Sequence, residues 1–494
     1  MTKYERLSAL DASFLELEDA NLHMHVGGVM IFDAAPVRGA GGGIDIERIR
    51  RAIQSRLHLV PRFRQRLGYI PYEHLPIWVD DERFRLNYHV RHASLPRPGD
   101  DRELKRLVGR IMSQPLDRSR PLWEMWVIEG LQGDRFALLS KSHHCMIDGI
   151  SAADVMSVIL RPTPDAAIEP PRPWAPRSHP SEARLVLDQW QRRATQATAA
   201  WGAIRDAINH PEKALRSLGQ SAAGVLEAMA PALSPVSETP INVKVGPHRR
   251  FDWLDMQLSD LKAVTRTLGG TINDIVLTVT SGALRTFLAE RGLDPNGLEI
   301  RAMVPVTVRT EEERGRLGNR LTEIVVPIPV QLTDPVARLR AVQRTTAVIK
   351  RSRHALGAQV LTTVSEWTAP SLLVQTVRLA SRSRACNLIV TNVPGPQVPL
   401  YLCGAPMLTT YPVVPLFQNM GIAVGLFSYN GGLFWGINGD WDTMTDLHEF
   451  VQALASSVRE LQHAADRVGR HPAPPRKRRR LMPVTIGARP LRAG

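Results

Sequence analysis

The sequence predicts a mixed α/β protein with two domains and a site in the cleft between them. The chain has 494 residues, which is more than one ordinary hydrophobic core accommodates. Its content of 44% apolar and 22% charged residues is typical of a folded chain rather than a disordered one. Both halves also alternate helical periodicity with short strand-like runs, although no sequence repeat relates them.

One strand and two amphipathic helices are predicted before residue 117. Residues 20–35 alternate and end like a strand. Residues 45–57 predict a helix, because the apolar side chains recur three or four positions apart at Ile46, Ile49, Ile53 and Leu57. Residues 101–116 predict a second amphipathic helix.

A hairpin is predicted next. Residues 123–131 and 135–144 are strand-like runs that meet at a Gln-Gly-Asp-Arg turn. Residues 151–160 then predict a helix, and Ser151 and Asp154 have the spacing of a capping box at its start. The intervening stretch, KSHHCMIDGI, therefore lies at a strand-to-helix junction.

A proline-rich linker and a long helix are expected to join the halves. Residues 161–180 contain seven prolines. Apolar side chains then recur at helical spacing on an otherwise basic segment: Trp190, Ala194, Ala197, Trp201, Ile204 and Ile208. Packing on a neighbouring domain is the usual interpretation of such a face, and contact with a lipid surface is the alternative.

The second half begins near residue 246. Residues 271–292 predict a helix, and strand-like runs follow at 300–309, 322–330, 387–393 and 420–438. We expect four segments along the chain: an N-terminal domain at 1–165, a linker and helical crossover at 166–245, a C-terminal domain at 246–465 and a basic disordered tail at 466–494.

Charge and composition narrow the classes of function. The net charge is +14, but nine Lys and Arg residues and no acid lie in 467–494, so the body is only mildly basic and a nucleic-acid-binding fold is not expected. The tail is either solvated or bound to anionic lipid. No apolar run is long enough for a transmembrane helix, and the N-terminus does not look like a secretory signal. Three widely spaced cysteines predict a reducing, cytoplasmic compartment.

The histidine pair at 143 and 144 is the strongest candidate for chemistry. Adjacent residues of an extended segment point to opposite sides, which argues against a metal ion bound by both. The backbone directs Cys145 away from His144, so Cys145 is interpreted as a buried small residue and not as a nucleophile. A neutral imidazole at a strand end can accept a proton near pH 7, which makes His144 a candidate base. On spacing alone, a packed loop with a satisfied histidine explains these residues equally well.

The wider motif, His-His-x-x-x-Asp-Gly, consists of His143, His144, Asp148 and Gly149. It resembles the signature of the CoA-dependent acyltransferase superfamily. Within that group the chain is similar to bacterial wax ester synthase/diacylglycerol acyltransferases, in stretches that run from about residue 5 to about residue 460. These stretches are LSALDASFLELE, MHVGG (24–28), PLDRSRPLWE (115–124), GPHRRF (246–251), TINDIVL (271–277), VPVTVR (304–309), TNVPGP (391–396) and LFSYNGGL (426–433).

The resemblance implies two chloramphenicol-acetyltransferase-like domains with the active site in a tunnel between them. It implies transfer of a long-chain acyl group from acyl-CoA to diacylglycerol, giving triacylglycerol, or to a fatty alcohol, giving wax ester. His144 would be the general base, His143 a supporting residue and Asp148 a structural aspartate. No acyl-enzyme, metal or cofactor beyond the acyl-CoA substrate is implied. Because the substrates are amphiphilic or insoluble in water, peripheral contact with a membrane or lipid droplet is expected.

Further motif residues have a structural and a functional interpretation. Pro121, Leu122 and Trp123 either shape the acyl channel or pack in the core. Asn273 and Asp274 match a family motif, although Asp274 can equally cap the helix with Thr271. The hydroxyl of Ser428 is a candidate oxyanion donor. The alternatives to this function are a condensation-type or polyketide-associated acyltransferase, and a catalytically weak lipid-binding relative.

Overall fold

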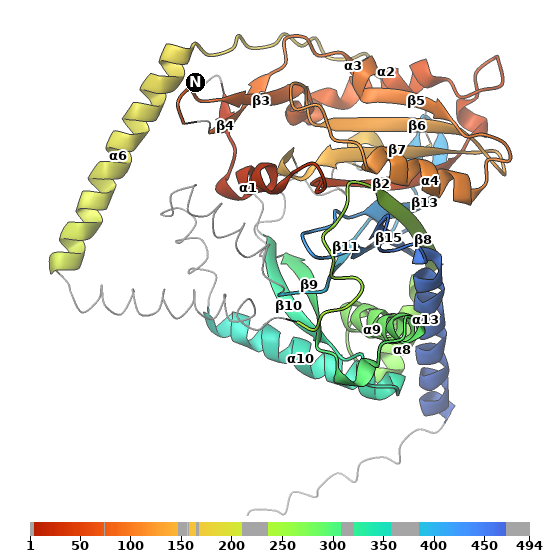
Figure 1. Ribbon diagram of the computed structural model, residues 1–494. Coiled ribbons are helices and arrows are strands. Elements are labelled where there is room, and N and C mark those ends of the chain that lie inside the picture. Colours follow the sequence, from red (N-terminus) through yellow and green to blue (C-terminus); the bar gives the residue numbers. More distant parts are fainter. Residues whose placement is uncertain are drawn as a thin grey trace, which may run out of the picture.

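The computed structural model describes residues 4–73, 75–146, 156, 158–164, 167–209, 236–307, 321–356 and 385–470. These residues form two six-stranded sheets and one sheet of three short strands. Figure 1 shows the two large sheets as separate layers, with helices on their outer faces and one long helix standing apart. The mixed α/β architecture predicted from the sequence is confirmed.

The first large sheet carries the histidine pair at the end of a central strand. Its strand order is β12-β13-β2-β7-β6-β5. The predicted hairpin is confirmed, because β6 and β7 are antiparallel neighbours, and β2 pairs with β7 so that His25 lies opposite His143. The strands are β2 (His25–Asp33), β5 (Val90–Ser94), β6 (Trp123–Leu131), β7 (Arg135–His143), β12 (Tyr401–Leu402) and β13 (Ala405–Val413).

The helices of this half include both that the periodicity predicts. Each begins at an aspartate whose side chain accepts a backbone N–H three residues on, Asp45 for α2 and Asp100 for α4. The α-helices are α1 (Ala9–Leu17), α2 (Ile46–Arg56), α3 (Leu86–His89) and α4 (Asp101–Met112); the small sheet has the order β1 (Glu5–Arg6), β4 (Pro76–Asp80), β3 (Gln65–Tyr69). Short 3-10 turns of this half are η1 (Ala35–Val37), η2 (Leu57–Leu59), η3 (Pro61–Arg64) and η4 (His144–Met146). One further 3-10 turn, η5 (Pro295–Gly297), lies in the second half.

The second large sheet has the order β10-β9-β11-β14-β15-β8. The four strand-like runs predicted in this half appear as β9 (Ile300–Thr307), β10 (Leu321–Ile328), β11 (Leu388–Pro394) and the hairpin β14 (Ile422–Tyr429) and β15 (Gly432–Asp440). The remaining elements are β8 (Arg249–Gln257), α8 (Leu258–Leu268), α9 (Ile272–Glu290), α10 (Pro335–Leu356) and α13 (Leu447–Arg470). The last helix thus extends past residue 465, where the sequence predicts a disordered tail to begin.

The two halves are connected through a strand that crosses between them. β13 belongs to the C-terminal half in sequence, but it pairs with β2, with Thr410 opposite Met30. It also passes close to β15, where a Cβ on Gly436 would lie 1.8 Å from the Pro412 carbonyl oxygen. Only glycine permits this approach. As a result, the core of the first sheet also contains Tyr411 and Phe434 from the second half.

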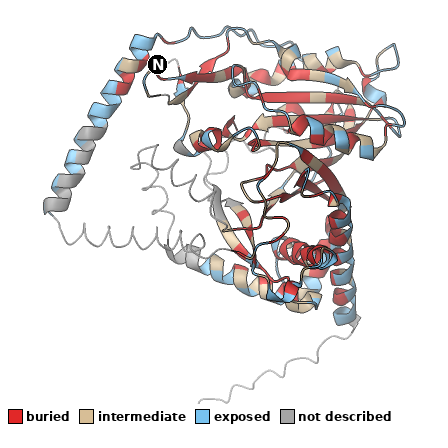
Figure 2. Cartoon of the chain, viewed as in Figure 1, coloured by how far each residue is buried: buried red, intermediate tan, exposed pale blue. Residues whose placement is uncertain are grey.

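The helix α6 (Glu182–Asn209) does not bury the tryptophan face that the sequence marks. Trp190 is 71% exposed and Trp201 is 70% exposed. Figure 2 shows exposed residues along most of the described part of this helix. Packing of the tryptophans on a neighbouring domain, the usual interpretation, is therefore wrong for this structure. Among the described residues, no helix combines the length and apolar character that a membrane span requires.

Candidate active site

The strand β7 ends at His143, and the chain turns at once into η4, which begins at His144. The change of backbone direction gives the two imidazoles different surroundings, as expected for adjacent residues. Asp148, Gly149 and the predicted capping box of Ser151 and Asp154 lie outside the described residues. The roles of Asp148 and Gly149 rest on the sequence resemblance, and the capping box rests on residue spacing alone.

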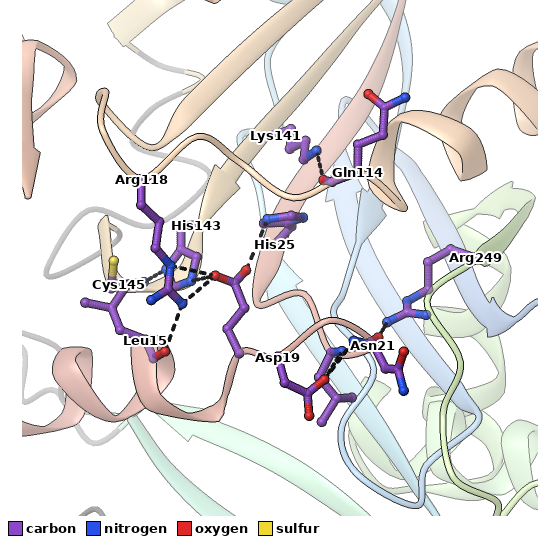
Figure 3. A network of polar contacts seen from close by, with 12 residues as sticks. Leu15, Asp19, Asn21, His25, Gln114, Arg118, Lys141, His143, Cys145 and Arg249 are labelled. Atoms are coloured by element: carbon purple, nitrogen blue, oxygen red, sulfur yellow. Dashed lines mark hydrogen bonds and ion pairs between the residues drawn. The ribbon is translucent and has the colours of Figure 1, made fainter.

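His143 is fully buried and its ring is held from two sides. Its Nδ1 accepts the backbone N–H of Cys145 at 3.2 Å, which leaves Nε2 as the ring nitrogen that carries a proton. That Nε2 is 3.5 Å from the carboxylate of Glu18. The surroundings thus select one tautomer and one orientation for His143. Figure 3 shows His143 beside Arg118 and Cys145, with His25 on the neighbouring strand.

His144 has a different environment, which keeps it neutral. Its ring stacks on Phe14 of α1 with 4.0 Å between the ring centroids, and its backbone N–H donates to the Met24 carbonyl at 2.7 Å. Burial of the imidazole, with a smaller electrostatic contribution from the neighbouring His143, lowers the pKa of His144 to about 4. At neutral pH the ring is therefore unprotonated and able to accept a proton.

A carboxylate that the sequence interpretation missed lies at the centre of the polar contacts. Glu18 is the C-cap residue of α1, and Arg118 contacts its Oε2 at 2.7 Å. The other carboxylate oxygen is 3.5 Å from His25 Nε2. Burial alone would raise the pKa of Glu18, but interactions with His143 and Arg118 lower it to about 2. Glu18 is therefore ionised under all ordinary conditions.

A signal for these residues was present in the sequence. Glu18 ends the first stretch that resembles the acyltransferase family, Arg118 lies in PLDRSRPLWE, and His25 lies in MHVGG. An acidic residue near the end of a helix usually faces solvent, and nothing in the local pattern pairs it with an arginine one hundred residues later. Only the fold brings the three together.

Cys145 lies in the same turn, and its environment does not favour a nucleophilic role. Burial raises the pKa of the Cys145 thiol well above its ordinary value, so the thiolate needed for nucleophilic attack is disfavoured. This agrees with its interpretation as a packed residue. Across the described ranges, no cluster of three His, Cys, Asp or Glu residues is arranged to hold a metal ion.

The Pro121-Leu122-Trp123 segment begins β6 and supports the end of β7. The backbone N–H of His143 donates to the Leu122 carbonyl at 2.9 Å. The Trp123 ring lies between Phe63 and His89, with centroids at 4.5 and 4.6 Å, and its Nε1 donates to the Phe63 carbonyl at 2.8 Å. In this structure the segment packs in the core and fixes the strand end that carries the histidines.

The Asn-Asp pair lies at the start of α9, in the other half. Thr271 and Asp274 form a reciprocal capping box, and the second oxygen of Asp274 accepts the Thr346 hydroxyl of α10 at 2.8 Å. Asn273 accepts the side-chain N–H of Asn392 at 2.6 Å, which ties the helix start to β11. The structure thus gives this pair well-defined supporting contacts between α9 and its neighbours.

Ser428 is on β14, in the second sheet. Its hydroxyl oxygen accepts the Gly395 N–H at 3.2 Å and a Gln397 side-chain N–H at 3.1 Å. Within the described residues the hydroxyl proton has no acceptor, so it is available to a ligand. The neighbouring Tyr429 accepts the Leu400 N–H at 2.8 Å and donates to the Met407 carbonyl, so it has a structural role.

The family models identify the chain along most of its length. The model described as the wax ester synthase/diacylglycerol acyltransferase catalytic domain matches residues 7–276, and the WS/DGAT C-terminal domain matches residues 317–462. A putative diacylglycerol O-acyltransferase of Mycobacterium tuberculosis is 33% identical, over 94% of this chain and 91% of that protein. A putative diacylglycerol O-acyltransferase of Mycobacterium bovis is 31% identical, over 92% and 95%.

Solved structures agree with this result. The wax ester synthase/diacylglycerol acyltransferase from Marinobacter aquaeolei VT8 superimposes with a TM-score of 0.65 at 27% identity, covering 93% of this chain and 100% of that one. The first condensation domain of the calcium-dependent antibiotic synthetase gives a TM-score of 0.58 at 14% identity, covering 94% and 96%, which indicates a shared fold alone. The chain belongs to the wax ester synthase/diacylglycerol acyltransferase family.

Proposed function

We propose that this protein is an acyl-CoA-dependent diacylglycerol O-acyltransferase that also accepts long-chain alcohols, with His144 as the general base. The observation that carries this proposal is the state of His144. The ring is neutral, packed against Phe14 and placed beside a His143 whose tautomer is fixed. These features lie at the His-His-x-x-x-Asp-Gly motif, for which the resemblance to CoA-dependent acyltransferases implies a role in acyl transfer.

The proposed reaction needs one proton acceptor and no covalent intermediate. As the acceptor hydroxyl attacks the thioester carbonyl, its proton passes to a ring nitrogen of His144. The tetrahedral intermediate then collapses, the carbon–sulfur bond breaks, and His144 returns the proton to the CoA thiolate. The acyl group ends as an ester and CoA leaves as the thiol, so the enzyme regains its starting state without a cofactor.

Most of the rate gain is expected from holding the two substrates together and stabilising the oxyanion. General base catalysis typically adds about 10²–10⁴-fold. His144→Ala should therefore lower turnover by about that factor and leave the melting temperature nearly unchanged. Near-full activity of purified His144→Ala would refute the assignment of the base.

The acceptor is tested directly with labelled palmitoyl-CoA and three acceptors: diolein, hexadecanol and a long-chain amine. Triacylglycerol as the main product supports the proposal, and wax ester as an additional product supports the wider acceptor range. Amide formation alone would favour condensation-type chemistry. Release of CoA at a rate that no acceptor changes would show that the protein is not a transferase for these acceptors.

We also propose that α6 places the enzyme on a lipid surface, since its substrates reside there. The helix docks on the three-stranded sheet through one side: Leu185 is buried, Asp188 accepts the Tyr4 hydroxyl at 3.2 Å, and Arg193 contacts Glu73 at 2.8 Å. Trp190 is five residues from Leu185, which places it on nearly the opposite side.

The side turned away from the protein has the composition of an interfacial helix. Trp190 and Trp201 are eleven residues apart, about three turns, so they share this side. Leu187, which is 49% exposed, lies next to Trp190. Arg184 and Arg193, which pair with Asp188 and Glu73 on the docked side, are largely exposed and lie at the two edges of this row. Tryptophan beside arginine suits the boundary between headgroups and acyl chains. The proposed location is therefore the cytoplasmic face of a membrane or a lipid droplet.

The double variant Trp190→Ala/Trp201→Ala tests this surface in a liposome flotation assay. Binding should fall at least tenfold, because burying one large apolar side chain is worth about 1.5–3 kcal/mol. The matched control is Trp441→Ala, which removes a tryptophan that is 43% exposed in the other half. Equal binding by the double variant and the control would remove α6 from the proposal.

A further inference from the structure

The end of α1 places a buried carboxylate, Glu18, among the imidazoles of the candidate site. Glu18 places a carboxylate at the C-terminus of a helix, where the helix dipole is unfavourable for negative charge. The side chain is only 8% exposed. A charge at the same helix end but facing solvent would avoid the cost of burial, and the solvent would screen the dipole. The position of Glu18 is therefore best explained by what it contacts.

Its contacts are the imidazoles of the candidate site and one arginine. The carboxylate lies 3.5 Å from His143 Nε2 and 3.5 Å from His25 Nε2, and these two histidines are opposite each other on β7 and β2. Arg118 donates to Glu18 through Nε at 3.1 Å and Nη2 at 2.7 Å. Its Nη2 also donates to the Leu15 carbonyl at 2.9 Å. The positive charge of Arg118 therefore offsets both the negative charge of Glu18 and the partial negative charge at the C-terminus of α1.

The same helix also contacts the other histidine. Phe14, one turn before Glu18, stacks on the ring of His144. One turn of α1 therefore holds both members of the histidine pair, Phe14 by an aromatic contact and Glu18 by charge. A shift of this turn would move both rings relative to the substrates.

We infer that Glu18, held by Arg118, is a positioning residue for acyl transfer: it fixes the Nε2–H form of His143 and, through the shared backbone turn, the placement of His144. This inference rests on the proposed function. A carboxylate facing the Nε2–H of an imidazole stabilises that tautomer and ring orientation, while the Cys145 N–H occupies the other nitrogen. In metal sites, loss of the carboxylate partner of a ligating histidine typically costs about 10–100-fold in affinity or activity, and we expect a loss of similar size here.

The test compares two amide substitutions, Glu18→Gln and Asp80→Asn. Asp80 is the matched control because it is another buried carboxylate of the same half, with a side chain 7% exposed and an arginine, Arg177, at 2.8 Å. It lies on β4 and its partners are Gln65 and Arg177. Both substitutions keep side-chain size and remove one buried charge, so both should lower the melting temperature.

Only Glu18→Gln should change catalysis. Measured well below the melting temperature, its kcat for diolein acylation should fall about 10–100-fold, with KM for palmitoyl-CoA within about threefold of wild type. Asp80→Asn should keep wild-type kcat. Equal kcat values for Glu18→Gln and wild type, or equal losses in the two variants, would overturn the inference and leave Glu18 as a structural residue. A wild-type protein that is inactive with every acceptor would instead refute the proposed function.

Discussion

The acid limb of the pH–activity profile tests the assignment of the base most directly. The perturbation is a change of pH from 8 to 4.5 with the wild-type enzyme. Because burial and the neighbouring His143 lower the pKa of His144 from 6.5 to about 4, the active neutral form should persist to unusually low pH. The profile of kcat/KM should therefore stay flat to about pH 5 and fall only as the pH approaches 4.

The size of the effect follows from the two pKa values. At pH 5.5 a histidine with a pKa of 6.5 is only about 9% neutral, whereas one with a pKa near 4 is about 97% neutral. The two cases differ about tenfold in expected activity at that pH. Burial also lowers the pKa of His25 well below 6.5, and Glu18 titrates near pH 2, so neither of these two groups produces a limb near pH 6.5.

The assay measures initial rates of CoA release with a short-chain acyl-CoA and a soluble alcohol, to avoid changes in substrate aggregation with pH. Enzyme incubated at pH 5 and returned to pH 7 should recover full activity, which separates titration from unfolding. A limb centred near pH 6.5 would refute the reasoning, because it would show that His144 is solvated and ordinary in the working enzyme, or that another histidine is the base.

Three further predictions concern the support of the site. The pKa of Glu18 is lowered from 4.5 to about 2, so its ionised form stabilises the fold by about 3 kcal/mol above pH 4.5. This stabilisation is lost as the pH falls toward 2. The difference in stability between wild type and Glu18→Gln should therefore close over that pH range in melting curves. Gly27→Ala should lower the free energy of unfolding by about 1–3 kcal/mol and reduce kcat, because the added Cβ would lie 1.9 Å from the Ser140 carbonyl oxygen on β7. Gly28→Ala is the control: its Cβ would have its nearest contact at 3.5 Å, so both the free energy of unfolding and kcat should be nearly unchanged. Thr271→Ala should cost about 1 kcal/mol by loss of the α9 cap, with kcat unchanged if the cap is purely structural.

Local patterns were sufficient to predict most individual elements. β2, α2, α4, the β6–β7 hairpin and α9 appear within a few residues of their predicted bounds. Each is encoded by periodicity, by a cap or by a turn inside one short segment. Such local patterns do not depend on the element that packs alongside, so the elements that they predict are found in the folded protein.

The pairing of strands that are far apart in the sequence could not be predicted from local patterns. β13 lies in the C-terminal half, yet its partner is β2, so residues near 410 sit beside residues near 30. No local pattern specifies that partner. The exposed tryptophans of α6 show a second limit of prediction from the sequence. Periodicity identifies one apolar face on the helix, but it does not distinguish a face that packs on protein from one that contacts lipid.

The stretches that resemble the acyltransferase family gain a common physical explanation from the fold. The first supplies Phe14 and Glu18, MHVGG supplies the Met24 carbonyl and His25, and PLDRSRPLWE supplies Arg118 and the Leu122 carbonyl. Every one of these groups contacts a histidine of the 141–150 motif or the Glu18 carboxylate. Separated by up to about one hundred residues in sequence, they converge on a single strand end. The resemblance is therefore specific where the histidine pair alone is not, because these stretches supply the contacts that hold the two adjacent imidazoles in place.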